Sequence, residues 1–532
     1  MSQPPPRVYP RVIIVGGGLG GLMLGILLDK MGVPYHIFER NHGINPVGAL
    51  MSLNGNILAV FDQLGLLEET MKISLASVNS SLFTEKLEKS TDIDFRSHFE
   101  YTGYKFIMFS RPELYAILYS KIHPTRISFG KRVLSTRRQA SGVQIVCSDN
   151  SCYEGDIIVG ADGVHSAIRH NMFREMKEKQ QQDCQRHQQA FRGDGSGSGS
   201  GTRVVIPPSD VKEMEMPYLC MTGTTRPLDP ARYPVLMHPN TQLHHVIGET
   251  TPFSWTVVTI PGNRFCWSVM AQIAKQADAK ERRFRNSETG PEANQGIIGA
   301  VQDFPVTFGG KLGEIIDATP KDKISKVLLE EKLFETWYHG DIVLLGDGGM
   351  NAMQDAVILA NSIYDLVDLR PECITAAFRD YKDQRYPHAK RQVANSRINA
   401  KISSGQTRTD RVVRHMVLNF LPRSIQNKQF SKDSAYRPQC TFLERVPDKG
   451  SVPSLPQRAS WRYEAEKRVA AAASAEKLRH SGIKVEYSSV SLPLSLSSSS
   501  SLSSSLSGRS SSSTRKISLT GRTRKYSNAR TV

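Results

Sequence analysis

A strand–turn–helix unit near the start of the chain constrains the fold more than any other feature. In RVIIVGGGLGGLMLGILLDKMGVPYHIFER, an apolar strand at 12–15 leads into a Gly-x-Gly-x-x-Gly turn that begins at Gly16, and an apolar helical stretch follows. A second strand at 35–38 ends in Glu39. This order of elements predicts a β-α-β unit with parallel strands, in which the glycine turn connects the first strand to the helix.

Each glycine of this turn has a physical role in binding a dinucleotide. Gly16 permits the tight turn, Gly18 lets the backbone approach a pyrophosphate, and Gly21 lets helix and strand pack closely. The free N–H groups and the positive end of the helix then face the phosphates. Glu39 has the spacing of an acid that accepts both ribose hydroxyls. The alternative is a glycine turn without a ligand. The turn alone does not separate FAD from NAD, and Arg40 leaves NADP open.

Composition divides the rest of the chain into segments. Strand and helix patterns alternate at first, aromatic and β-branched runs predict antiparallel strands in the middle, and strand and helix patterns then return. Gln-rich and Gly-Ser repeats predict a flexible insertion. The predicted segments are 1–10 (disordered N-terminus), 11–175 (dinucleotide-binding domain), 176–203 (flexible insertion), 204–335 (substrate domain), 336–402 (return of the dinucleotide-binding domain, and helices), 403–460 (C-terminal extension) and 461–532 (largely disordered, Ser-rich basic tail).

Charge and cysteine content limit the partners. The net charge is +17, and the stretch from Gly508 to Val532 holds seven basic residues and no acid. Such a tail leaves peripheral contact with an anionic membrane open, but a solvated disordered end is the simpler interpretation, and no specific nucleic-acid binding is expected. The seven cysteines form no CxxC pair, which predicts reduced thiols, no metal site and a cytoplasmic protein. The oligomeric state is not predicted.

Three further segments carry a family resemblance. They are SRPELYAIL at 110–118, GDIIVGADGVHSAIR at 155–169 and GDIVLLGDGGMNAMQDAV at 340–357. With the glycine turn, they resemble the single-component FAD-dependent monooxygenases of the aromatic-hydroxylase type, and other stretches resemble fungal enzymes close to the epoxidases of indole-diterpene and meroterpenoid biosynthesis. The resemblance implies an α/β fold, with a Rossmann-like FAD-binding domain on a parallel sheet, a mainly antiparallel β substrate domain and a helical C-terminal part.

The resemblance also implies roles for individual residues. Arg111 would contact pyrophosphate or ribityl oxygens, Asp162 with Gly163 would serve both FAD and NAD(P)H, and Asp347 would accept a hydrogen bond from a ribityl hydroxyl. Tyr218 is the candidate catalytic residue, against the alternative that it packs in the core. The expected cofactor-binding residues are Gly16, Gly18, Gly21, Glu39, Gly48, Ala49, Arg111, Asp162, Gly163, Asp347, Gly348 and Gly349.

The implied reaction uses NAD(P)H and O2 to epoxidise or hydroxylate an apolar terpenoid or prenylated secondary metabolite, through a flavin hydroperoxide. Aromatic-ring hydroxylation is the alternative reaction. FAD carries the oxygen chemistry, and the protein orients the cofactor and the substrate and excludes water from them. The implied partners are therefore a small apolar organic substrate and O2.

One departure from the family pattern bears on activity. In the family, the aspartate at position 347 is followed by a loop with a histidine, a proline and further glycines, whereas here Asp347 meets Gly348-Gly349-Met350-Asn351 directly. Three interpretations follow. Gly348 and Gly349 provide a shortened set of N–H donors, the protein is a degenerate flavin-fold protein without catalysis, or a coding segment is skipped in this sequence. A shorter loop would expose the flavin ring to water, which favours unproductive loss of peroxide.

Overall fold

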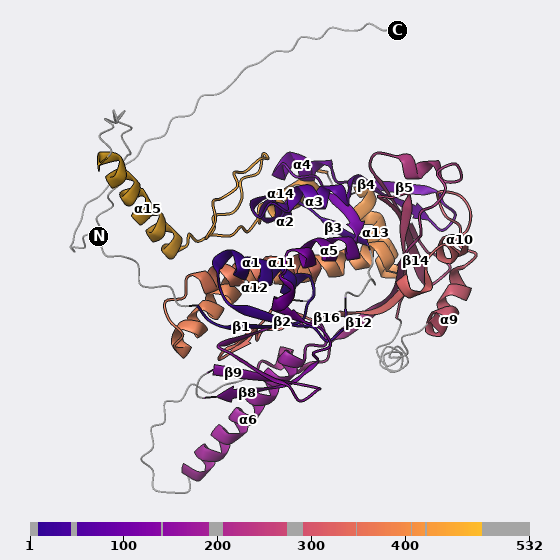
Figure 1. Cartoon of the computed structure of the whole chain (residues 1–532). Coiled ribbons are helices and arrows are strands. Elements are labelled where there is room, and N and C mark those ends of the chain that lie inside the picture. Colours follow the sequence, from indigo (N-terminus) through magenta and orange to yellow (C-terminus); the bar gives the residue numbers. More distant parts are fainter. Residues whose placement is uncertain are drawn as a thin grey trace, which may run out of the picture. The chain divides into compact units, whose positions relative to one another are not determined.

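The computed structural model in Figure 1 describes most of the chain. The described residues are 9–43, 50–139, 142–190, 206–273, 291–346, 348–405, 407–420 and 423–480. The chain separates into one compact unit over Met1–Ala473 and a second over Ser474–Val532. In the second unit, the described residues are the end of one helix, up to His480.

A six-stranded sheet carries the glycine turn. Its strand order is β17-β18-β11-β1-β2-β7, and the pairs from β18 to β7 are parallel, whereas β17 is antiparallel. Strands from residues 12–160 and from residues 338–344 therefore lie in one sheet. The strands are β1 Val12–Val15, β2 Tyr35–Phe38, β7 Ile127–Ser128, β11 Ile157–Gly160, β17 Tyr338–His339 and β18 Ile342–Leu344.

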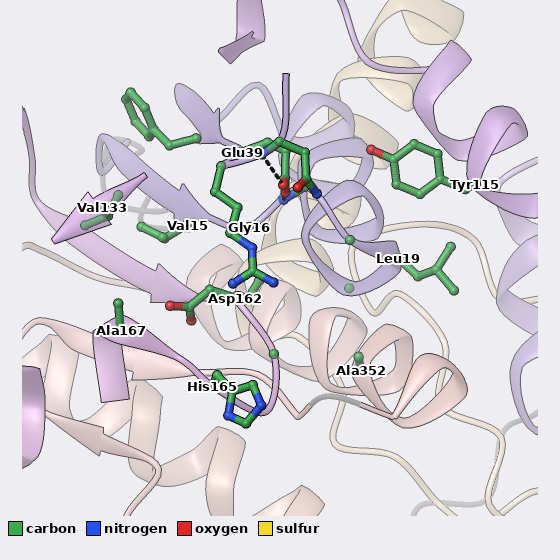
Figure 2. A pocket seen from close by; sticks show the side chains of 18 of the residues that line it. Val15, Gly16, Leu19, Glu39, Tyr115, Val133, Asp162, His165, Ala167 and Ala352 are labelled. Carbon is green, nitrogen blue, oxygen red and sulfur yellow. Dashed lines mark hydrogen bonds between the residues drawn. The ribbon is translucent and has the colours of Figure 1, made fainter. Parts of the chain in front are cut away.

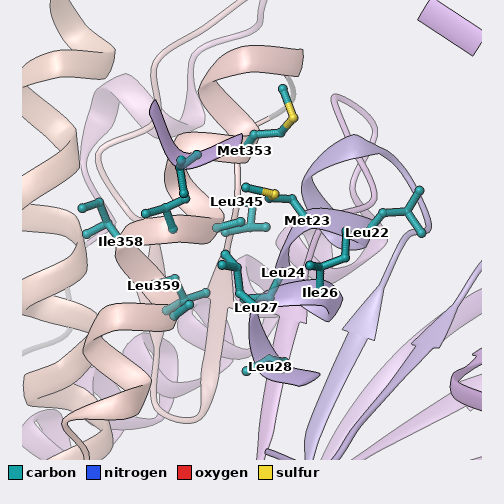
Figure 3. Packing of buried hydrophobic residues seen from close by; sticks show 14 of the residues in the cluster. Leu22, Met23, Leu24, Ile26, Leu27, Leu28, Leu345, Met353, Ile358 and Leu359 are labelled. Carbon is teal, nitrogen blue, oxygen red and sulfur yellow. The ribbon is translucent and has the colours of Figure 1, made fainter. Parts of the chain in front are cut away.

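Both faces of this sheet are buried, as expected of parallel strands. Alternate residues of β1 point to opposite faces, so that Val12 and Ile14 pack with helices while Ile13 and Val15 pack on the other side. The helical layer consists mainly of α1 Leu19–Met31, α5 Arg111–Ser120 and α11 Gly349–Tyr364. Figure 3 shows apolar side chains of α1 and α11 in this layer, with Leu27 of α1 beside Leu359 of α11.

The opposite face is covered by a three-stranded antiparallel sheet and a long helix. The sheet consists of β8 Val133–Gln139, β9 Gly142–Cys147 and β10 Cys152–Gly155, in the order β10-β9-β8, and the helix is α6, Ala167–Ala190. The sequence predicts a flexible insertion from residue 176, but the structure continues α6 through 176–190. The Gln- and Lys-rich composition of this part is compatible with a solvated helix, because both residues are good helix formers. Residues 191–203 of that prediction lie outside the described residues.

A second large sheet has nine strands and is mainly antiparallel. Its path is β16-β12-β15-β14-β13-β4-β6-β3, with β5 paired to β4, and the β13–β4 pair is parallel. The mainly antiparallel sheet expected at 204–335 is thus present, but residues 50–110 contribute β3 to β6 to it. The strands are β3 Leu50–Leu53, β4 Leu75–Thr84, β5 Lys89–Asp94, β6 Ile107–Ser110, β12 Glu215–Thr224, β13 Thr241–Ile247, β14 Phe253–Ile260, β15 Arg264–Gln272 and β16 Ser325–Glu331.

A separate apolar core lies on this sheet. Trp255 and Trp267 are buried in it, and their indole N–H groups donate to Pro305 O at 3.0 Å and to Thr319 Oγ1 at 2.8 Å. Both tryptophans therefore pack in the core with their polar atoms satisfied. The shorter elements of the chain are α2 Gly55–Gln63, α3 Leu67–Lys72, α4 Arg96–Thr102, α7 Pro208–Val211, α9 Pro291–Val301, α10 Leu312–Asp317 and the 3-10 turns Pro124–Arg126, Pro234–Met237 and Lys321–Lys323.

Four helices follow the return of the parallel sheet. They are α12 Pro371–Ser404, α13 Arg408–Phe420, α14 Arg423–Ser434 and α15 Trp461–His480. The sequence predicts disorder from residue 461, whereas the structure has a helix there as far as His480; the basic end of the tail lies outside the described residues. Among the described residues, no helix combines the length and apolar character that a membrane span requires.

Candidate functional site

The glycine turn is held by contacts that leave no room for side chains at two of its positions. Gly16 has a φ of +110°, and a Cβ there would lie 2.3 Å from Ala161 O. A Cβ at Gly21 would lie 2.1 Å from Gly16 O. By contrast, a Cβ at Gly18 would meet nothing within 4 Å. Gly16 and Gly21 are thus required by the fold, whereas Gly18 leaves open space for a ligand to approach the backbone.

Helix α1 presents its positive end at this turn. Gly18 is its N-cap residue, and no side chain caps the helix there. The first turn also lacks an acidic residue. The first N–H groups of a helix have no partner within the helix itself, so these donors and the helix dipole favour an anion at this position.

Glu39 closes the other side of the turn, at the end of β2. Its side chain is oriented by two backbone donors: Gly17 N–H at 2.7 Å from Oε2 and Asn41 N–H at 2.9 Å from Oε1. The residue is only 9% exposed. Each carboxylate oxygen keeps a further lone pair for a ligand. Figure 2 shows Glu39 beside Gly16 at the cavity described next.

These groups line a cavity of about 310 Å³. It extends from the glycine turn to the ends of β11 and β18, where Ala161 and Gly346 lie in its wall. Figure 2 shows residues of several distant segments around it. Its walls include four basic side chains, which complement a doubly charged pyrophosphate. They are Arg40, Arg111, Lys131 and Arg132.

Arg111, which the sequence singles out, is the first residue of α5 and follows β6 directly. Its side chain reaches the cavity wall, with Pro112 and Tyr115 beside it. The sequence reasoning missed Lys131 and Arg132, because they lie in a loop that carries no motif. Their backbone is held by two hydrogen bonds: Lys131 N–H donates to Glu39 O at 2.8 Å, and Arg132 O accepts from Ser148 N–H at 2.8 Å.

Asp162 and Gly163 also lie in this cavity wall, immediately after β11. Gly163 adopts a φ of +80°, which suits glycine. Asp162 Oδ2 accepts from Ile168 N–H at 3.2 Å, while Oδ1 is buried without a hydrogen-bond partner among the described residues. Burial raises the pKa of Asp162. An acceptor left over in a cavity wall fits a hydroxyl or amide donor on a ligand.

The turn after β18 is as abrupt as the sequence indicates. Strand β18 ends at Leu344, and helix α11 begins at Gly349 with Gly348 as its N-cap. Gly349 lines the first cavity with Gly346, whereas Gly348 borders a second one. Asp347, Gly48 and Ala49 lie outside the described residues.

The second cavity, of about 290 Å³, shares Gly163 and Gly346 with the first as wall residues. It lies among the start of α6, the end of β16, and helices α11 and α12. Its lining combines nine apolar side chains with ten polar or charged ones, among them Glu330, Glu331 and Asp355. The apolar ones are Val164, Met214, Leu333, Phe334, Trp337, Leu344, Leu345, Ala389 and Val393.

Tyr218 lines neither of these two cavities. It lies on β12 and is 5% exposed, and burial raises the pKa of its hydroxyl, with Asp410 contributing in the same direction. The structure therefore does not bring Tyr218 together with the other candidate residues, and its catalytic role stays a prediction.

Comparison with known proteins identifies the cofactor domain. Residues 9–188 match the family model of an FAD binding domain. The chain is 26% identical to the FAD-dependent monooxygenase ausM of Penicillium brasilianum, over 76% of this chain and 80% of that protein. It is 27% identical to the FAD-dependent monooxygenase ptmM of Penicillium ochrochloron, over 73% of this chain and 87% of that protein.

Solved structures support the same fold. The chain resembles Klebsiella pneumoniae HpxO, which is complexed with FAD and uric acid, at a TM-score of 0.60 and 19% identity, over 80% of this chain and 97% of that one. It also resembles the tetracycline destructase Tet(51), at a TM-score of 0.55 and 13% identity, over 85% of this chain and all of that one. These likenesses confirm the predicted α/β flavoprotein fold.

The residues of the first cavity fit FAD. The open space at Gly18 and the uncapped start of α1 suit a pyrophosphate, and the oriented carboxylate of Glu39 suits a ribose. The unused oxygen of Asp162 offers an acceptor farther along the cavity, near the ends of β11 and β18. The expected cofactor therefore has a built site in this chain.

Proposed function

Because this chain is a flavoprotein of the FAD-dependent monooxygenase type, we propose that it inserts one oxygen atom of O2 into an apolar organic molecule. The proposed substrate is a terpenoid or prenylated secondary metabolite, and the reaction is epoxidation or hydroxylation. NAD(P)H supplies two electrons, one oxygen atom enters the substrate, and the other leaves as water. When bound, FAD supplies the electron transfer and the activation of O2.

The second cavity is the observation that carries this proposal. It borders the first cavity at Gly163 and Gly346, so that an apolar molecule in it would lie next to a cofactor held by the glycine turn. Ligand sites are commonly apolar clefts with a few placed polar groups. Phe334 and Trp337 supply aromatic surface there, which an apolar substrate would contact.

The protein's own residues supply binding, orientation and exclusion of water. The start of α1 and the basic side chains of the first cavity bind the anionic part of FAD, and Glu39 orients the ribose. The apolar side chains of the second cavity, such as Phe334 and Trp337, would shield the reacting atoms from water, which protects reactive intermediates from unproductive decay. At the start of α11, Gly349 lines the first cavity and Gly348 lines the second.

The test is a coupled turnover assay with isotopically labelled O2. Purified protein is reconstituted with FAD and given NADPH and either an isoprenoid alcohol, farnesol or geranylgeraniol, or the aromatic probe 4-hydroxybenzoate. We expect the isoprenoid probes to stimulate NADPH consumption and to gain one labelled oxygen atom, as detected by mass spectrometry. Labelling of the aromatic probe alone would indicate an aromatic-ring hydroxylase. NADPH consumption that yields only peroxide with every probe would contradict oxygen insertion.

A further inference from the structure

We propose that the buried ion pair between Asp355 of α11 and Arg385 of α12 is a positioning device for the cofactor, because it holds the backbone at Gly346, after β18. This inference rests on FAD binding in the first cavity and is independent of which substrate is oxidised. Asp355 and Arg385 would act through the backbone of Gly346 and would not themselves contact FAD. Asp355 lies in the segment 340–357 that carries the family resemblance, but the sequence analysis gives neither Asp355 nor Arg385 a role toward the cofactor.

The pair is short and removed from solvent. Arg385 Nε lies 2.6 Å from Asp355 Oδ1, and the two side chains are 0% and 2% exposed. The second oxygen of the carboxylate, Oδ2, accepts the backbone N–H of Gly346 at 2.8 Å. The carboxylate thus connects a cation on α12 to the backbone of the turn, and Gly346 is a wall residue of both cavities.

Helix α12 also holds the same strand end through a second contact. Tyr381 lies one helical turn before Arg385, so the two side chains share one face of α12. The Tyr381 hydroxyl donates to Leu344 O at 3.0 Å, and Tyr381 is fully buried. Leu344 O and Gly346 N–H, on either side of Leu345, are therefore both fixed from α12, one directly and one through Asp355.

Stability alone is a poor reason for such a pair. The free energy needed to remove two charges from water offsets much of the attraction between them. Apolar residues of similar size therefore often replace a buried ion pair without loss of stability. An apolar replacement would, however, leave Gly346 N–H without its acceptor. Gly346 lines both cavities. The orientation of its backbone therefore determines how this part of the wall meets a bound ring system.

The experiment compares variants of the pair with a variant of a second ion pair, in which one partner is buried and the other is partly exposed. The control is Arg437 with Asp448, which are 3.0 Å apart with exposures of 2% and 29% and which line neither cavity. FAD dissociation constants are measured by flavin fluorescence on the full chain, and the melting temperature of each apo-protein is measured beside them. We expect D355N to raise the FAD dissociation constant at least tenfold, and D448N to raise it less than threefold at a comparable loss of melting temperature.

The double variant D355L/R385M separates positioning from stability. We expect it to melt above D355N, because no charge is left buried without a partner, and still to bind FAD at least tenfold more weakly, since its apolar pair accepts no hydrogen bond from Gly346. A folded double variant with wild-type FAD affinity would overturn the proposal. If the double variant does not fold, G346A tests the same contact, because its Cβ would lie 2.9 Å from Asp355 Oδ2; unchanged FAD affinity in G346A would equally overturn it.

Discussion

Replacing Gly18 with alanine should separate cofactor binding from folding. The added methyl group would meet no protein atom within 4 Å, because this position faces the first cavity. The backbone of Gly18 is extended, with φ −74° and ψ −176°, which alanine adopts without strain. The apo-protein should therefore fold normally, with a cost of about 1 kcal/mol or less from the poorer N-cap.

The effect on FAD follows from the same geometry. A methyl group at Gly18 occupies the space through which a pyrophosphate approaches the N–H groups of α1. Hydrogen bonds to a charged group contribute about 1.5–3 kcal/mol each, and each 1.4 kcal/mol is about tenfold in affinity. Loss of one such bond raises the FAD dissociation constant about 10- to 100-fold.

The assay is a titration of apo-protein with FAD, followed by flavin fluorescence, together with thermal unfolding of the apo-protein. Gly21→Ala is the matched control, since its Cβ would lie 2.1 Å from Gly16 O, a backbone atom that cannot move aside. We expect G21A to lower the melting temperature, through overpacking of about 1–3 kcal/mol or more, while G18A leaves it nearly unchanged. A G18A protein that binds FAD as tightly as the wild type would refute the assignment of this turn to the pyrophosphate.

Three further substitutions test separate parts of the account. Glu39→Ala removes the oriented acceptor for the ribose, and we expect an FAD dissociation constant about 10- to 100-fold higher by equilibrium titration; an unchanged constant would contradict the ribose role. Tyr218→Phe removes only a hydroxyl, and a catalytic role predicts slower turnover at unchanged FAD affinity, whereas equal turnover would leave Tyr218 a packing residue. Burial lowers the pKa of His244 to about 4, with a smaller contribution from Lys89. The unfolded chain takes up this proton at about pH 6.5, so the stability due to neutral His244 is present above about pH 6.5 and lost as the pH falls towards about 4. We expect His244→Asn to show a smaller drop in melting temperature between about pH 7 and pH 5 than the wild type; an equal drop would contradict this assignment.

Local patterns predict the cofactor half of the fold well. The strand before Gly16 and the strand before Glu39 begin and end in the structure where the sequence places them. Their apolar runs are short, bounded by glycine or charge, and repeated with a helix between them, so that local propensity and tertiary packing agree. The resemblance to flavin monooxygenases is likewise confirmed by the family model and the fungal relatives.

Long-range pairing is what the sequence does not show. Residues 50–110 contribute β4 to the second sheet through a parallel pair with β13, far away in the chain. No local pattern identifies such a partner, because a strand's neighbours depend on the whole topology. The helices at 176–190 and 461–480 are missed for a different reason, since their composition is also typical of disordered segments.

The same limit applies within the site. Lys131 and Arg132 reach the first cavity from a loop without a motif, and Asp355 becomes notable only when Arg385 and Gly346 N–H are seen around it. A signal for Asp355 does exist in the sequence. It is a carboxylate within NAMQDAVILA, a helix that is apolar almost all round, and such a group requires a buried partner.

The most direct test of the central claim is an equilibrium titration of the full-length apo-protein with FAD, followed by displacement with ADP. If the first cavity holds the dinucleotide through the glycine turn and Glu39, the chain will bind one FAD, and ADP will compete for the same site because it carries the pyrophosphate and the ribose. A folded protein that binds no FAD at any concentration, or that binds FAD without competition from ADP, would contradict this account.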